Sequence, residues 1–476
     1  MRRSFTFNGI RKPYVVMLAG KQRPPFAARR RNILNVRGRP GGLLSSTETD
    51  PLPIHVPIGF VGDSSGIIAD MKDELADWLL TDEPVPLIFD DEPNRIYYAV
   101  VENTLDDFEE FANLRKGTIQ FICPDPFKYK STSYFGDFID DGYVLDNEGS
   151  AEIEPIFEAT VLEPITFMQV ATEQEYMMIG EPAEVTQPTY ERYTRVLNQN
   201  MSSIVGWTNS NEIDGARAGS MESNGFRFQP VSFGSGSGWH GPALKTSLPG
   251  APYTDFLMNA IVGFWNGAGQ VGRVEIYLLD DQNRTVAKIA MKDTRPGESV
   301  GWGEARLGDS VINHHMIDEF GDRKGNWNSF YGVLRLQRNG NQWYAYIAKV
   351  DQETGRHHTI RSVRWTDADN VFNRNVSQVV VHFGQYGTHR TGAMGVYDLK
   401  VDRINQQQAG IPYIAQADDV ITFDHRTNNI LINGESRIDL KDFGATYFSL
   451  KKGQTPLFVM PEGKLSTRVK WQERFK

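Results

Sequence analysis

The chain has almost no cysteine and no long apolar run, and both absences narrow what it can be. Cys123 is the single cysteine in 476 residues, which excludes an intrachain disulfide and a cysteine-rich metal site. No stretch is apolar enough to span a bilayer, and the basic N-terminus lacks the apolar core of a signal peptide. We therefore expect a protein made in a cytoplasm that stays soluble until it assembles into, or leaves with, a larger particle.

Negative charge is absent from the start of the chain. Residues 1–47 hold eleven Lys and Arg and no Asp or Glu, whereas residues 70–110 hold fourteen Asp and Glu against two basic residues. Two interpretations remain open. The basic block of one copy can meet the acidic block of the next copy, or the blocks can be solvated or neutralise each other within one domain. The net charge of −10 argues against specific nucleic-acid binding by the whole chain.

Helical periodicity is also scarce. Residues 65–80 place apolar side chains on one helical face, with Ser64 or Ser65 as the N-cap and prolines beyond the end. Residues 108–114 are a candidate second, short helix. After Tyr134 the periodicity nearly vanishes, and strand-like segments alternate with turn residues. These patterns predict a mainly β fold with one N-terminal helix.

Three familiar motifs lack the context that their chemistry needs. Residues 62–66 match G-x-S-x-G, but no His or acid is placed by a recognisable pattern, so a serine helix cap is favoured over a hydrolase nucleophile. Residues 267–272 match G-x-G-x-x-G but precede a strand, which favours a hairpin turn over a phosphate site. A hairpin turn is likewise favoured over a calcium site at residues 280–283. We predict no catalytic residue, no metal and no cofactor.

Tryptophans in the middle of the chain suggest a binding surface. Trp239, Trp302 and Trp327 each lie among Gly, Asn and Ser, where exposed loops are expected. Flat aromatic faces stack on sugar rings, so these three are the candidate saccharide-binding residues. The alternative is that they fold back to cover the ends of a β-sandwich.

Several strings resemble one family. LIFDDEPNRIYYAV (Leu87–Val100) and FICPDPFKY (Phe121–Tyr129) near the start, with ITFDHRTNNILINGES and VKWQERF near the end, resemble the distal tail protein (Dit) family of siphovirus-type bacteriophages. WHGPALKTSLP (Trp239–Pro249) resembles the carbohydrate-binding-type insertion of the long, "evolved" form of that family.

The resemblance implies three domains. Residues 1–130 are expected to form an α+β ring-forming tail domain. Residues 131–198 and 411–476 are expected to form one discontinuous galectin-like β-sandwich. Residues 199–410 are expected to form an inserted jelly-roll or carbohydrate-binding-like β-sandwich.

The resemblance also implies a role in the virion. The expected function is a hub ring, hexameric in this family, at the distal end of the tail. Its expected partners are other copies of the chain, the tail tube protein, the tail-associated tip protein and a host cell-surface saccharide, with no membrane. A non-enzyme is expected; a cell-wall-degrading glycosidase and a free lectin-like protein stay open as alternatives.

Overall fold

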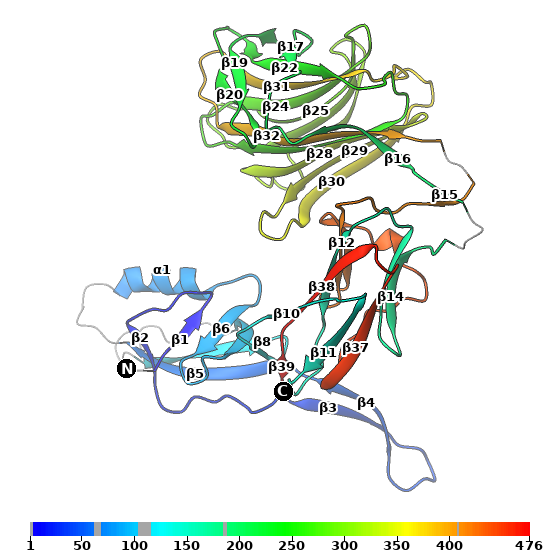
Figure 1. Ribbon diagram of the computed structural model, residues 1–476. Helices are drawn as coiled ribbons and strands as arrows, with labels where there is room; N and C mark the ends of the chain where they lie inside the picture. The colour runs from blue at the N-terminus through cyan, green and yellow to red at the C-terminus, as the bar shows by residue number, and fades with distance from the viewer. Residues whose placement is uncertain (1–2, 61–67, 103–115, 184–187, 407–408) are drawn as a thin grey trace.

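Short strands and tight turns dominate the structure, as the scarcity of helical periodicity predicts. The computed structural model describes residues 3–60, 68–102, 116–183, 188–406 and 409–476. Figure 1 shows three β-rich parts: an N-terminal sheet with a helix, a small sandwich, and a larger sandwich at the far side of the small one. The predicted mainly β class is confirmed. No helix among the described residues has the length and apolar character needed to cross a membrane.

The N-terminal part is one sheet in the order β1-β6-β7-β8-β5-β2, with β9 paired to β7 and β39 paired to β9. The strands are β1 (Phe5–Phe7), β2 (Val15–Met17), β5 (Leu52–Phe60), β6 (Val85–Phe89), β7 (Arg95–Val101), β8 (Lys116–Cys123), β9 (Lys128–Lys130) and β39 (Arg474–Phe475). Because β39 pairs with β9, the end of the chain returns to the sheet built by its beginning.

Helix α1 (Ile68–Leu79) covers this sheet. Trp78 is buried and stacks on Phe5 with ring centroids 5.5 Å apart, and its Nε1–H donates to the Phe7 carbonyl at 3.0 Å. The predicted caps Ser64 and Ser65, the G-x-S-x-G motif and the second helix at 108–114 lie outside the described residues.

A two-stranded hairpin projects from the N-terminal part (Figure 1). Its strands are β3 (Arg29–Leu34) and β4 (Leu43–Thr49), and every residue of both is exposed. The glycine-rich turn between them is the sequence signal for this strand pair.

The small sandwich draws its strands from two distant stretches of sequence. One sheet has the order β10-β38-β12-β34-β35-β36 and the other β11-β37-β13-β14. The strands are β10 (Tyr134–Asp137), β11 (Gly142–Asn147), β12 (Ile156–Val161), β13 (Phe167–Ala171), β14 (Tyr176–Gly180), β34 (Val420–Asp424), β35 (Asn429–Ile432), β36 (Glu435–Ser436), β37 (Gly453–Met460) and β38 (Leu465–Trp471). A 3-10 turn, η1 (Ile438–Leu440), follows β36. The chain passes to the large sandwich after β15 (Thr189–Tyr190) and returns from it at β33 (Ile411–Pro412), and these two short strands pair in parallel.

The large sandwich has two sheets, which we name by their distance from the rest of the chain in Figure 1. The near sheet has the order β19-β20-β32-β23-β28-β29-β30, with β16 beside β32. Its strands are β16 (Tyr193–Gln199), β19 (Ser220–Ser223), β20 (Phe228–Ser232), β23 (Phe256–Trp265), β28 (Phe330–Asn339), β29 (Gln342–Val350), β30 (His357–Thr366) and β32 (Ala393–Ile404). The domain division expected from the sequence leaves β16 in the small sandwich; its pairing with β32 places it in the near sheet instead.

The far sheet has the order β17-β22-β31-β24-β25-β26-β27, with β21 beside β31 and β18 beside β21. Its strands are β17 (Thr208–Asn209), β18 (Ala216–Arg217), β21 (Trp239–Gly241), β22 (Ala243–Ser247), β24 (Gly272–Leu279), β25 (Thr285–Asp293), β26 (Trp302–Gly308), β27 (Asn313–Glu319) and β31 (Gln378–Tyr386).

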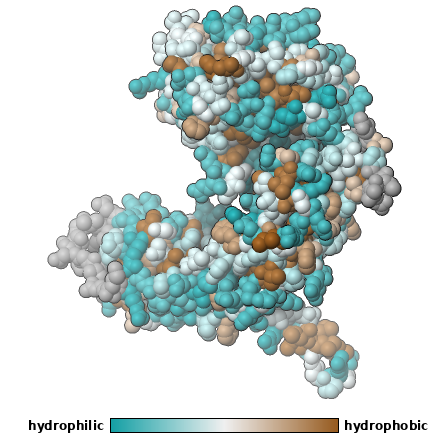
Figure 2. Space-filling view, in the orientation of Figure 1, coloured by the Kyte–Doolittle hydropathy of each residue, from teal (hydrophilic) through white to brown (hydrophobic). Residues whose placement is uncertain are grey.

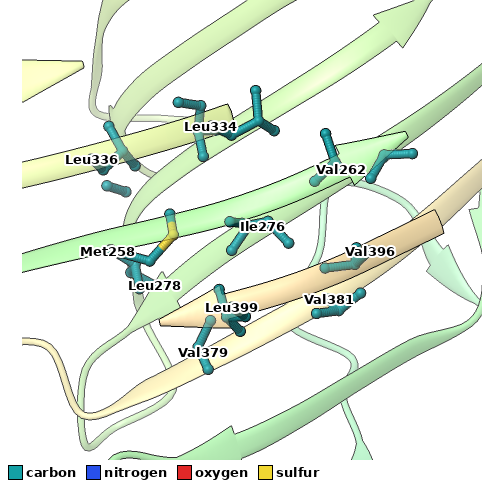
Figure 3. Close-up of a cluster of buried hydrophobic side chains, with 14 of the residues drawn as sticks. Met258, Val262, Ile276, Leu278, Leu334, Leu336, Val379, Val381, Val396 and Leu399 are labelled. Atoms are coloured by element: carbon teal, nitrogen blue, oxygen red, sulfur yellow. The ribbon is translucent and has the colours of Figure 1, made fainter. Parts of the chain in front are cut away.

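Alternating apolar side chains from the two sheets form the core between them. Figure 3 shows Met258, Val262, Leu334 and Leu336 of the near sheet opposite Ile276, Leu278, Val379 and Val381 of the far sheet. Period-two alternation sends every second side chain of these strands inward, so the two inner faces together form the core of a sandwich.

The G-x-G-x-x-G turn, which the sequence predicts as a hairpin, is a connection between sheets. It links β23 of the near sheet to β24 of the far sheet. The hairpin prediction is wrong here because a turn sequence reports a chain reversal and not the partner of the next strand. Pro461–Gly463 likewise links β37 to β38 across the small sandwich. At residues 280–283 the flanking strands do pair, and the prediction is confirmed.

The near sheet rests on the small sandwich. Arg335 of β28 forms an ion pair with Glu435 at 2.8 Å, and the backbone N–H of His357 donates to the Gly434 carbonyl at 2.9 Å. The outer face of the far sheet is therefore turned away from the rest of the chain (Figure 1).

Candidate saccharide-binding face

The outer face of the far sheet carries charge and yet is buried. In β24 the side chains of Val274, Ile276 and Leu278 enter the core, so those of Arg273, Glu275 and Tyr277 point outward, and all six are buried. An antiparallel sheet with one solvated face would leave the outward set exposed. Something on this face must therefore cover and pair these charges.

Lys288 is the centre of that pairing. Its Nζ lies 2.8 Å from Glu304, 2.9 Å from Asp214 and 3.3 Å from Glu275, and its side chain is 2% exposed. Asp214 lies in the loop before β18 and also accepts a bond from Arg306 at 2.7 Å. The loop thus folds over the middle of the face and closes an ionic network, as buried charges require partners.

This network keeps its carboxylates ionised. Burial raises the pKa of Glu275, but Arg273 and Lys288 more than offset it and leave that pKa well below its ordinary value. Burial likewise raises the pKa of Glu304, and Lys288 and Lys292 reverse the shift. Both acids are therefore carboxylates at neutral pH.

The chemistry of a glycosidase does not fit this pair. Glu275 and Glu304 both contact one ammonium group, so they lie close together, and by proximity alone the pair would suit a retaining enzyme. A general acid must hold a proton, which requires a raised pKa, and both pKa values are lowered. The arrangement stabilises the sheet and provides no acid for bond cleavage.

Trp239 lies on this face beside the part that the Asp214 loop covers. It is half-buried, its ring lies over the Arg273 guanidinium at 4.0 Å, and its neighbour is the exposed Tyr386 at 5.3 Å. Gly384 lies opposite Arg273 in the ladder, and a Cβ there would come within 3.1 Å of Arg273 Nε. A glycine at this position leaves the room in which the arginine and the tryptophan stack.

Trp302 lies on the same row of the sheet. The ladder pairs Arg273 with Lys292 and Lys292 with Trp302, so the three side chains leave one face side by side. Trp302 is half-buried, its Nε1–H donates to Asp318 at 2.7 Å, and the Arg295 guanidinium lies 5.3 Å from its ring. We name Trp239, Arg273, Lys292 and Trp302 the tryptophan row.

Trp327 does not join this row. It is fully buried in the core, its Nε1–H donates to the Thr359 carbonyl at 3.1 Å, and its ring packs over Gly303. The expectation of an exposed loop tryptophan is wrong here. The neighbouring Gly and Asn do form turns, but a side chain on a turn can point into the sandwich, where Gly301 and Gly303 leave space for an indole.

The structure also bears on the turn at residues 280–283, on metal ligands and on the single cysteine. The Asp280 carboxylate is bonded to Arg284 and to turn backbone, as the hairpin interpretation predicts. In the parts of the chain that the structure describes, no three His, Cys, Asp or Glu side chains are grouped as metal ligands. Cys123 is buried, which raises the pKa of its thiol to about 12 and makes it unreactive.

Ion pairs within the chain join the basic and acidic blocks of the N-terminal part. The intrachain ion pairs are Arg11–Asp90, Lys12–Glu74, Lys21–Asp91 and Arg23–Glu92. This supports the second of the two interpretations for these residues. Arg29, Arg31, Arg37 and Arg39 of the β3–β4 hairpin are exposed and have no ion pair among the described residues.

Sequence reasoning missed Arg273 and Lys292. A signal was present in RVEIYLL, where Arg273, Glu275 and Tyr277 alternate with apolar residues along the strand. The pattern alone gives no sign that these charges lie between two tryptophans, because Trp239 and Trp302 come from strands far away in the sequence.

Comparisons with known proteins agree with the fold at both ends of the chain. The family model described as a phage tail protein RIFT-related domain matches residues 14–123, and that of the siphovirus-type tail component, C-terminal domain, matches residues 393–475. The distal tail protein of Bacillus phage SPP1 is 30% identical over 95 residues, which cover 20% of this chain and 37% of that relative.

Solved structures add two similar chains. The CBM2 module of the evolved Dit of Lactobacillus casei BL23 phage J-1 is 17% identical, with a TM-score of 0.40, over 46% of this chain and 99% of that module. The Dit protein of phage SPP1 is 20% identical, with a TM-score of 0.33, over 38% of this chain and 75% of that protein.

The two family models lie at opposite ends of the chain, on the N-terminal sheet and on the strands that complete the small sandwich. The curated relative carries the name that the sequence strings suggested. The chain is similar at both ends to siphovirus-type tail components, and it matches 37% of the length of the distal tail protein of Bacillus phage SPP1.

Proposed function

We propose that this protein is a structural component of the distal end of a siphovirus tail, where its copies form a hub that joins the tail tube to the tip, and that its large sandwich adheres to a host cell-wall saccharide. The observation that carries the proposal is the pair of family models on the N-terminal sheet and the small sandwich. The hub role requires self-association, and the adhesion role requires an accessible binding face.

The β3–β4 hairpin is the feature best suited to self-association. Its apolar side chains are exposed, with Ile33 61% and Leu44 59% exposed. Figure 2 shows hydrophobic surface on this projecting arm. A contact between an arm and a different surface of the next copy is heterologous, and such contacts close a ring when repeated by rotation. The hexamer and the tube and tip partners are the expectation for this family.

Assembly is tested on the full chain by sedimentation across a range of concentrations. We expect a closed oligomer of fixed size for the natural sequence. Ile33→Ser with Leu44→Ser should shift the protein toward the monomer, whereas Phe443→Ser, which changes an exposed aromatic in the small sandwich, should not. Immunogold labelling of purified particles should mark the tail tip. A protein that stays monomeric at all concentrations, or label elsewhere on the particle, rejects the hub role.

The large sandwich supports adhesion through its orientation. Its near sheet contacts the small sandwich, so the tryptophan row faces away from the hub. Trp239 and Trp302 remain candidate residues for stacking on a sugar ring, whereas the buried Trp327 cannot reach a ligand. Several copies in one ring would bind with an avidity gain on the order of 10²–10⁴ without any new contact.

Adhesion is tested with fluorescently labelled full-length protein on host cells. The natural sequence should decorate the cell wall, and Trp239→Ala with Trp302→Ala should remove the signal while sedimentation and melting remain unchanged. Turnover of purified wall by the natural protein would support the glycosidase alternative. A labelled protein that binds no host wall rejects adhesion and leaves the large sandwich a structural spacer.

A further inference from the structure

We propose that the tryptophan row takes a neutral, hydroxyl-rich saccharide that lies across the strands from Trp239 to Trp302, and that it discriminates against phosphate- and carboxylate-bearing wall polymers. This inference rests on the adhesion role proposed above and adds to it the class of ligand and its direction on the sheet.

The direction follows from the register. Arg273, Lys292 and Trp302 occupy consecutive positions across β24, β25 and β26, and Trp239 stacks on Arg273. Two interstrand spacings separate Arg273 from Trp302, about 10 Å. That length accommodates more than one sugar ring between the two indoles. A chain running along the strands would meet only one of them.

The expected charge of the ligand follows from the ion pairs that Arg273 and Lys292 of the tryptophan row already form within the protein. Arg273 pairs with Glu275 at 3.4 Å, and Lys292 pairs with Glu304 and with Asp318 at 3.2 Å. An anionic ligand needs a cation that it can pair with, and here it would have to compete with carboxylates that already pair with Arg273 and Lys292. A neutral saccharide makes no such demand, because stacking on an indole needs only C–H groups.

A buried pair of nitrogens at the Trp239 end indicates a hydroxyl. His382 Nδ1 lies 3.0 Å from the Pro242 carbonyl, which can only accept, so the ring proton is on Nδ1 and Nε2 is an acceptor. Burial lowers the pKa of His382 to about 4, which keeps this ring neutral. Its Nε2 and Arg273 Nε, a donor, have no hydrogen-bond partner, and both border the space above Gly384 at 3.3 and 3.1 Å from an added Cβ.

A partner for both nitrogens must accept one hydrogen bond and donate the other. A water molecule does both, and because the two nitrogens are buried it is through such a water that a sugar hydroxyl would be bonded. An ionised phosphate or carboxylate oxygen can only accept, and it would face the lone pair of His382 Nε2 with the Glu275 carboxylate only 3.7 Å from that atom. The polar lining and the ion pairs therefore select the same class of ligand.

The experiment uses the full-length protein on an array of immobilised glycans. One set contains neutral oligosaccharides of glucose, galactose, rhamnose and N-acetylglucosamine; the other contains uronates and poly(glycerol phosphate). Each set is measured from low salt to about 1 M NaCl, where the Debye length is about 3 Å. We expect binding to one or more neutral glycans that is insensitive to salt, because charge screening leaves stacking unaffected. Trp239→Ala and Trp302→Ala should each weaken it about tenfold or more, as loss of a stacking ring implies.

Two control variants make the result specific. Phe226→Ala removes an aromatic that is 79% exposed on the β19–β20 turn of the same sandwich, and it should leave binding unchanged. Arg390→Ala removes an exposed cation whose backbone carbonyl bonds to Val271, two residues before Arg273, and for which no ion pair is found in the described part of the chain. It should also leave binding unchanged if the ligand is neutral.

The outcomes separate this inference from the function on which it rests. Binding to anionic glycans that weakens with salt and with Arg390→Ala overturns the neutral class and leaves adhesion standing. Neutral binding that survives both tryptophan variants overturns the tryptophan row as the site. Failure to bind any glycan or host wall overturns adhesion itself.

Discussion

The two sheets of the large sandwich bury their outer faces by different means. The outer face of the near sheet is mainly apolar and aromatic, with Val333, Tyr346 and Ala348 buried, and the ion pair from Arg335 ties it to Glu435 of the small sandwich. The outer face of the far sheet is ionic and is closed by the loop that carries Asp214. Both faces follow the same period-two alternation, so the alternation does not decide which part of the chain covers a face.

The difference assigns each face a role. A face that packs on a neighbouring domain fixes orientation. The outer face of the far sheet is instead covered in its middle by the loop that carries Asp214, and the half-buried Trp239 and Trp302 lie beside the covered part. The outer face of the far sheet therefore combines a buried ionic network around Lys288 with two half-buried tryptophans, Trp239 and Trp302. Three properties are open to test: how tightly the ionic network around Lys288 is coupled, whether Trp302 lies outside the core that holds Trp327, and how strongly the near sheet is bound to the small sandwich.

The largest effect is expected from the centre of the ionic network. Lys288→Met should destabilise the large sandwich by about 3–5 kcal/mol, because Glu275 and Glu304 lose a shared cation while buried. Calorimetry of the full chain should show one transition move down in temperature. Lys324→Met removes a cation from an exposed pair with Glu298 and should cost less than about 1 kcal/mol. Equal effects of the two variants would contradict a tightly coupled network.

The two tryptophans Trp327 and Trp302 should respond in opposite ways. Trp327→Ala opens a cavity in the core and removes the bond to Thr359, so we expect a loss of about 3–5 kcal/mol in the free energy of unfolding. Trp302→Ala should cost about 1 kcal/mol or less, since it lies outside the core, and should weaken saccharide binding about tenfold or more. Denaturant unfolding measures the first quantity and glycan binding the second. A Trp302→Ala variant as unstable as Trp327→Ala would place Trp302 in the core.

Acid should weaken the far sheet through His382. Burial lowers its pKa from 6.5 to about 4, with Arg273 adding to the shift and Glu275 opposing it. The unfolded chain binds the proton first, so the stabilising contribution is complete above pH 6.5 and is lost as pH falls toward 4. The expected loss is at most about 3 kcal/mol.

His382→Gln measures this contribution. Stability of the large sandwich in the variant should fall less steeply between pH 6.5 and 4 than in the natural protein, as measured by urea unfolding at each pH. The comparison with the natural protein is needed because the pKa values of His357 and His425 are also lowered to about 4, chiefly by burial. Parallel pH profiles in the two proteins would show that His382 is not a buried neutral ring.

The smallest effect is expected at the contact between the near sheet and the small sandwich. A double-mutant cycle with Arg335→Ala and Glu435→Ala should give a coupling free energy of about 0.5–1 kcal/mol, because the pair is only partly buried. The same cycle on the exposed pair Arg468–Asp137 should give less. Small-angle scattering of Glu435→Ala should show a wider spread of orientations. No coupling and no change in scattering would mean that the strand pairs β15–β33 and β16–β32 alone hold the orientation.

Much of the fold could be predicted because local chemistry acts over a few residues. Short stretches of sequence are enough to predict three features: the Asp280–Asn283 turn, the Gly-rich turn after β3 and the alternation in β24. The site could be predicted only in part. Trp239 and Trp302 were recognisable as candidates, but their shared face depends on the register of β24, β25 and β26 and on the packing of Trp239 against Arg273.

The sequence by itself determined the strand-rich class, turns such as Asp280–Asn283, the resemblance to one phage tail family at both ends and the tryptophans worth testing. The tertiary structure decided that Pro461–Gly463 crosses between sheets, that Trp327 points into the core and that Lys288 gathers three carboxylates. The physical reason is the range of the interactions. Turn and strand preferences arise between neighbours in the chain. Strand partners, side-chain burial and ion pairs depend on segments far apart, such as Lys130 and Glu473, which form an ion pair across 343 residues of sequence.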